Sequence, residues 1–178
     1  MFILTSRFNN ETLKANYDYR EKLGIPCIYA CPCKISRYVD LGVNCSVIEM
    51  NNSTNNIVGI GFIKNKIDYN KYYNIHYDRN YNRYIYKGYA FISREKLIEY
   101  NTEFIELLEK LLFKGKSHSK RGMGLTLMPK KLLIYIDKDG EMERHNNSDY
   151  VKKNDRIINI VEEINKINKL LLDSKILK

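Results

Sequence analysis

Residues 114–131 carry the densest group of residues capable of chemistry in this chain. Their sequence, KGKSHSKRGMGLTLMPKK, has no acidic residue and six basic ones: Lys114, Lys116, Lys120, Arg121, Lys130 and Lys131. This basic loop has a net charge of +6, against a formal net charge of +9 for the whole protein. Such a local concentration is typical of a site for a polyanion, although a basic loop that is only solvated is the alternative. Its glycines, Gly115, Gly122 and Gly124, would let backbone N–H groups approach a phosphate.

His118 adds a second interpretation of the basic loop. A nuclease or phosphoryl-transfer enzyme could use His118 as general acid or base, with Lys116, Lys120 or Arg121 stabilising a developing phosphorane. The sequence has no paired carboxylates beside this histidine, and the GKS at 115–117 lacks the spacing of a phosphate-binding P-loop. Binding without catalysis is therefore the first prediction, and the enzyme is its alternative.

The cysteines and histidines do not have the spacing of a metal site. Cys27, Cys31, Cys33 and Cys45 follow a C-x3-C-x-C-x11-C pattern rather than paired C-x2-C motifs. The three histidines, His76, His118 and His145, lie far apart in the sequence. We expect reduced cysteines, no metal and no cofactor.

The chain is of a length that predicts one domain over residues 1–178. Its first residues, MFILTSR, are too short and lack the basic start of a secretion signal, and no stretch approaches twenty apolar residues. These features predict a soluble intracellular protein with no membrane partner.

Short β-branched and tyrosine-rich segments separated by polar turns predict an α+β fold. We expect helices at 11–22 and 94–113, the second restarting with Thr102 as a cap, and strands at 2–8, 27–30, 45–50, 57–63, 71–77, 83–92 and 132–136. The strands would form a small, bent, five- or six-stranded β-barrel with the helices packed outside.

Two strand patterns bear on a binding surface. Gly59 and Gly61 share one face of their strand, which would admit a ligand or another backbone, or else serve a bend of the barrel. Tyr84 and Tyr86 also share a face, which would be a half-buried tyrosine face or a platform for stacking on bases.

The carboxy-terminal segment 155–178 has the clearest helical periodicity. Ile157, Ile164 and Leu171 fall at one heptad position, and Ile160 and Ile167 at a second. We expect this amphipathic helix to pack on its own domain. A homodimer through Ile157, Ile164 and Leu171 is the alternative.

The order of several motifs resembles the PUA-like superfamily, in its branch of EVE and YTH domains. The matching segments are Val39-Asp-Leu-Gly42, the strand Ser46–Met50, the asparagine-rich turn 51–56, Ile57-Val-Gly-Ile-Gly61 and the segment Arg121–Pro129. The resemblance covers residues 27–131 and implies a small mixed β-barrel that binds nucleic acid, including modified or flipped bases. EVE and YTH pockets usually present tryptophan, and this chain has none, so an aromatic cage would need tyrosine or phenylalanine.

On specific residues, the resemblance implies that Asn51 and Asn52 read a base edge and that Tyr29 stacks on a base. It also makes Arg121 the leading candidate for a phosphate or base contact. The charged and aromatic residues indicate RNA or another single strand rather than duplex DNA, because no helix-turn-helix pattern is present. A scaffold protein that oligomerises, with its charge serving only solubility, is the remaining class.

Overall fold

A computed structural model of the chain describes residues 1–114, 118–138, 141–144 and 156–176. Two compact units are present, residues 1–127 and 128–178, and each is considered by itself. The prediction of one domain over residues 1–178 stays a prediction.

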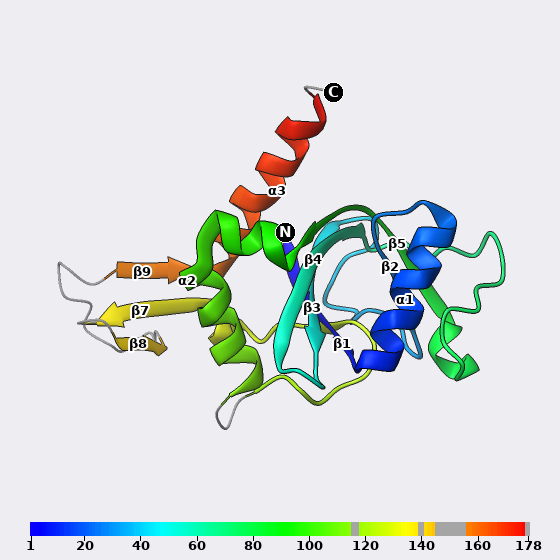
Figure 1. Ribbon diagram of the computed structural model, residues 1–178, viewed down its shortest axis with the longest axis horizontal. Helices are drawn as coiled ribbons and strands as arrows, with labels where there is room; N and C mark the ends of the chain where they lie inside the picture. Colours follow the sequence, from blue (N-terminus) through cyan, green and yellow to red (C-terminus); the bar gives the residue numbers. More distant parts are fainter. Residues whose placement is uncertain (115–117, 139–140, 145–155, 177–178) are drawn as a thin grey trace. The chain divides into compact units, whose positions relative to one another are not determined.

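The first unit is α+β, with a curled six-stranded sheet that forms a half-barrel (Figure 1). Its strands are β1 (Phe2–Phe8), β2 (Ile28–Cys31), β3 (Asn44–Asn51), β4 (Asn56–Lys64), β5 (Tyr84–Ser93) and β6 (Thr126–Leu127). Their order is β2-β5-β4-β3-β1-β6, and β1 runs parallel to β3 whereas the other neighbours are antiparallel. The curl places Leu4, Val47, Ile63 and Tyr86 in one buried cluster.

Helix α1 (Asn10–Leu23) connects β1 to β2. Asn9 and Thr12 form a reciprocal capping box at its start, and Gly24, with a positive φ of 61°, ends it. The Asn16 amide donates to the carbonyl of Ile28 at 2.9 Å, which fixes the helix beside β2. This helix matches the predicted segment 11–22.

Helix α2 (Arg94–Phe113) follows β5 and has the predicted bounds. It kinks at Asn101, whose side chain accepts from the backbone of Phe104 and thereby caps the second half. The predicted cap Thr102 is therefore wrong, since its hydroxyl donates back to the carbonyl of Ile98 instead.

Residues 71–77 do not form the predicted strand. The side chain of Asn82, at the end of the short helix η1 (Arg79–Asn82), accepts from the backbone N–H groups of Ile75 and His76 and donates to the carbonyl of His76. These side-chain hydrogen bonds satisfy the backbone in place of a strand ladder.

The second unit begins with the short helix η2 (Lys130–Leu132). Strands β7 (Ile134–Lys138), β8 (Glu141–Arg144) and β9 (Arg156–Asn159) form an antiparallel sheet in the order β8-β7-β9, and α3 (Ile160–Ile176) follows. The predicted helix 155–178 thus starts later, and Ile157 lies in β9 because it pairs with Ile136 of β7. The stripe of Ile157, Ile164 and Leu171 is therefore not one helical face, and the packing of α3 and a homodimer stay predictions.

Candidate functional site

The half-barrel has a seam between its two edge strands. Strand β6 pairs with β1 at Leu4 and Thr5. Among the described residues, the rest of β1 toward its end, Ser6–Phe8, therefore pairs with β3 alone. A cavity of about 540 Å³ lies at this open section. Its walls come from β1, α1, β2, the turn after β3, the segment before β5 and the basic loop: Ser6, Arg7, Phe8, Asn9, Glu11, Thr12, Ala15, Tyr29, Ala30, Asn52, His76, Tyr77, Asp78, Tyr81, Gly122 and Gly124.

Arg7 joins the floor of the cavity to the basic loop. Its Nε donates to the carbonyl of Ser119, and its Nη1 donates to the Thr126 hydroxyl at 2.9 Å. Burial lowers the pKa of Arg7, but a guanidinium remains charged at neutral pH. Gly122, with φ of 136°, lies so close that a Cβ would stand 3.2 Å from the Arg7 guanidinium carbon. Glycine is needed there for both its conformation and its size.

Asn52 joins the turn after β3 to the same loop. Its backbone N–H donates to the carbonyl of Phe8 at 2.7 Å, and its side-chain Nδ2 donates to the carbonyl of Lys120 at 3.0 Å. The amide orientation is thereby fixed. The Asn52 Oδ1 atom is buried and has no hydrogen-bond partner among the described residues, so it can accept from a ligand.

Part of the cavity wall is aromatic. His76 is 8% exposed and its ring lies 6.3 Å from that of Tyr81 in an edge-to-face arrangement. Burial lowers the pKa of His76, so its imidazole is neutral at pH 7. Its Nδ1 is also buried without a partner within the described part of the chain. This part of the wall therefore combines two rings set edge to face with a buried, unpaired nitrogen behind its surface.

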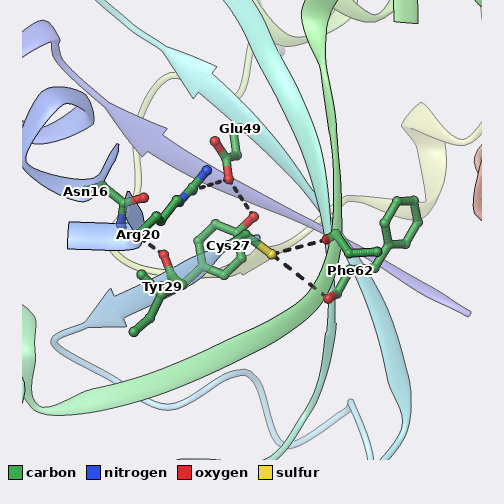
Figure 2. Close-up of polar contacts among 8 residues, drawn as sticks. Asn16, Arg20, Cys27, Tyr29, Glu49 and Phe62 are labelled. Atoms are coloured by element: carbon green, nitrogen blue, oxygen red, sulfur yellow. Dashed lines mark hydrogen bonds and ion pairs between the residues drawn. The ribbon is translucent and has the colours of Figure 1, made fainter. Parts of the chain in front are cut away.

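A buried polar network holds α1 against the sheet, as Figure 2 shows. Arg20 of α1 is 5% exposed and pairs with Glu49 of β3, which is fully buried; Tyr29 donates to the same carboxylate oxygen at 2.6 Å. Cys27 donates to the carbonyl of Ala90 at 3.3 Å, and burial raises the pKa of this thiol to about 12, so it is not a nucleophile at neutral pH. The network supports the cavity wall that α1 supplies.

The pocket residues predicted from the sequence have different outcomes. Asn52 and Tyr29 line the cavity, and Asn51 lies beside it, donating to Asn10 at 2.9 Å. The Tyr29 ring is 1% exposed and its hydroxyl is held by Glu49, so the predicted stacking on a base is not available to it.

Tyr84 and Tyr86 share one face of β5, as predicted, but Tyr86 is not available for stacking on a base. Tyr86 is buried because residues 32–39 cover it, and the Ile35 N–H donates to its hydroxyl at 3.0 Å. Tyr84 is half-buried and lies outside the cavity wall. Gly61 does not face a ligand, because the Tyr29 hydroxyl occupies the space that a Cβ would need.

The basic loop residues lie in several places. Lys114, His118 and Arg121 are exposed, and Lys120 donates to Asn55 Oδ1 at 2.6 Å. Lys116 falls outside the described residues. Lys130 and Lys131 are exposed on η2, in the second unit.

Sequence reasoning missed most of the cavity wall, above all Arg7, Ala15, His76 and Tyr81. Arg7 gave one available signal, as a charged residue near the end of an otherwise uncharged strand. Ala15, His76 and Tyr81 come from separate segments, and nothing in the sequence of one segment indicates that it lies near the others.

Among the described residues no three His, Cys, Asp or Glu side chains are grouped as a metal site would need. A search of the same residues finds no helix with the length and apolar character to cross a membrane. No family model, curated protein or solved structure significantly matches this chain.

Proposed function

We propose that this chain is a non-catalytic module that binds single-stranded nucleic acid, RNA in the first place, with one base held in the seam cavity. The observation that carries the proposal is that the most basic segment of the chain forms part of the wall of its cavity. Gly122 and Gly124 line the cavity, and Lys120 is tied to Asn52. A cavity of about 540 Å³ is within the usual range for small-ligand sites.

The distribution of charge supports placing the base inside and the phosphates outside. The charged side chains of the cavity wall are Arg7, Glu11 and Asp78, so the interior does not favour a dianion. The exposed Arg121 adjoins the cavity-lining Gly122, and Lys114 is exposed at the start of the basic loop. Phosphates bind to exposed cations through counterion release, whereas bases need aromatic surface and a few fixed polar atoms.

Asn52 gives the interior its polarity. The Asn52 Oδ1 is buried and unpaired among the described residues, and the amino group of a base is a donor that would satisfy it. Tyr81 supplies an aromatic ring of the kind on which bases stack. This arrangement agrees with the resemblance to EVE and YTH domains, so a PUA-like identity is part of the proposal, as is a soluble, intracellular protein.

The first test compares binding of labelled ten-nucleotide RNA, the corresponding DNA strand and its duplex over a salt series, by fluorescence polarisation. Lys120→Ala with Arg121→Ala should weaken RNA binding by about 1–3 kcal/mol at moderate salt and reduce the salt dependence by about two phosphates. Lys22→Ala with Lys96→Ala removes two exposed lysines from α1 and α2 and is the matched control. Equal binding by wild type and the Lys120/Arg121 variant at every salt concentration would refute the role of the loop.

A second variant tests the cavity separately. Ala15→Leu fills space at the α1 wall without removing a contact, and it should weaken RNA binding while the protein remains folded. Glu21→Leu, on the exposed last turn of the same helix, is its control.

His118→Ala tests the nuclease alternative, because loss of a catalytic histidine would abolish cleavage and leave binding intact. A scaffold protein would show no salt-dependent binding of RNA at all.

A further inference from the structure

A second basic and aromatic surface lies at one end of the β2–β5 ladder. Cys31 pairs with Tyr84 at this end, and the chain leaves both strands in segments that carry Lys34, Arg37 and Arg83. We call Lys34, Arg37, Arg83 and Tyr84 the ladder-end platform. No part of the cavity wall belongs to it.

The backbone beneath the platform is fixed by the core. Ile35 and Val39 are buried, and the Ile35 N–H is bound by Tyr86. Lys34 and Arg37, between and beside these anchors, are exposed. Their side chains therefore project from a rigid segment rather than from a loose loop.

The platform combines positive charge with aromatic rings. Lys34 Nζ and the Arg83 guanidinium carbon lie 5.7 Å and 5.8 Å from the centre of the Tyr84 ring. The Arg37 guanidinium lies 5.5 Å from the ring of Tyr38, which is 71% exposed. Residues 79–94 contain four basic and no acidic residues, and residues 32–39 contain two and none. Cations interleaved with rings are the chemistry that binds a single strand, because phosphates meet the cations and bases stack on the rings.

Two contacts and one chain connection relate the platform to the cavity wall. Cys33, beside Lys34, has its Sγ 4.0 Å from the carbonyl of Met123, and a Cβ on the cavity-lining Gly124 would stand 3.0 Å from the Cys31 Cβ. Tyr81 of the cavity wall is two residues from Arg83 along the chain. These links put the platform within reach of a strand that leaves the cavity.

We propose that the ladder-end platform binds the nucleotides adjacent to the one in the cavity, so that the ligand is a single-stranded tract and not an isolated nucleotide. This inference rests on the proposed function. It predicts that affinity rises with oligonucleotide length until the strand reaches the platform, and that the rise depends on Lys34 and Arg83.

The test measures binding of single-stranded RNAs of one, two, four, six and ten nucleotides to wild type and to Lys34→Ala with Arg83→Ala. Two phosphate contacts on a single strand change the salt slope by about 1.4, which corresponds to about 25-fold in affinity at 0.1 M relative to 1 M salt. The platform variant should therefore lose about 25-fold for the ten-nucleotide RNA at 0.1 M salt and little for the shortest RNAs. The Lys22/Lys96 double-alanine variant, with the same loss of charge, should behave as wild type.

Failure of the platform inference and failure of the proposed function give different results. If the platform variant binds the ten-nucleotide RNA with wild-type affinity and salt slope while Ala15→Leu weakens it, the platform inference is overturned and the proposed function stands. If wild type binds no single strand of any length, both are overturned. An acidic peptide that competes for the platform while RNA does not would also overturn the inference.

Discussion

The buried pair of Arg20 and Glu49 makes a sharp prediction about stability. Glu49 is fully buried and Arg20 is 5% exposed, so replacing Glu49 by leucine leaves a cation without its partner in the core. We expect Glu49→Leu to lower the free energy of unfolding by about 3–5 kcal/mol, a large share of the roughly 5–15 kcal/mol typical of a domain.

The double replacement should behave differently. Glu49 Oε2 and the Nε and Nη1 atoms of Arg20 have no hydrogen-bond partners among the described residues, so the pair is incompletely compensated for its loss of water. Arg20→Met with Glu49→Leu removes both charges and retains apolar contact with Tyr17 and Phe91, whose rings lie 4.8 Å and 5.0 Å from the guanidinium. The same change leaves the buried Tyr29 hydroxyl without its acceptor, which costs about 1–3 kcal/mol and opposes the gain of about 1–4 kcal/mol from removing the charges. We therefore expect the double variant to lie within about 2 kcal/mol of wild type and to be clearly more stable than Glu49→Leu alone.

Urea unfolding followed by circular dichroism measures both effects, provided that the slope with urea is unchanged between variants. A loss below about 1 kcal/mol for Glu49→Leu would refute the reasoning, as would a double variant destabilised by about the sum of its single changes. If Glu49→Leu fails to fold, the double variant still decides the question.

Two further predictions concern Gly61 and His76. Gly61→Ala should destabilise the protein by about 1–3 kcal/mol in urea unfolding, because the new Cβ must displace the Tyr29 hydroxyl from Glu49; wild-type stability would contradict this. Burial lowers the pKa of His76 below its ordinary 6.5, so the unfolded state binds the proton more readily. The contribution of His76 to stability should be complete above about pH 6.5 and decline as the pH falls below it. His76→Gln should reduce the difference in urea midpoint between pH 7.5 and 5.5, and an unchanged difference would exclude His76 as its source.

The local sequence pattern predicted correctly the strands that are rich in β-branched residues. It predicted a strand wrongly where side-chain hydrogen bonds take the place of pairing with another strand. Strands β3 and β4 were predicted to within a residue or two at each end, because both contain runs of β-branched residues beside an asparagine-rich turn. Segment 71–77 was predicted as a strand from its three tyrosines, but its backbone bonds to the Asn82 side chain. No periodicity encodes such a contact, so the sequence could not exclude the strand.

The site was harder to predict, because it depends on which face of each strand is covered. The period of two correctly placed Tyr84 and Tyr86 on one face, yet it could not show that residues 32–39 cover Tyr86. Asn52 was found through a resemblance, whereas Arg7 and Ala15 become wall residues through the seam, where β6 leaves part of β1 unpaired. A seam is a property of the curled sheet and not of any one segment.

The Arg20–Glu49 pair has a consequence for the cavity wall. The connection from β1 to β2 passes through α1, and α1 contributes Glu11, Thr12 and Ala15 to that wall. Buried ion pairs contribute little net stability, so their retention is better explained by the position that they fix. Here the pair fixes Arg20 and its helix over Glu49, which keeps Ala15 in the wall of the cavity. It follows that the double variant Arg20→Met with Glu49→Leu, although stable, should bind RNA less well than wild type, since an apolar contact does not specify the position of α1 as a charge pair does.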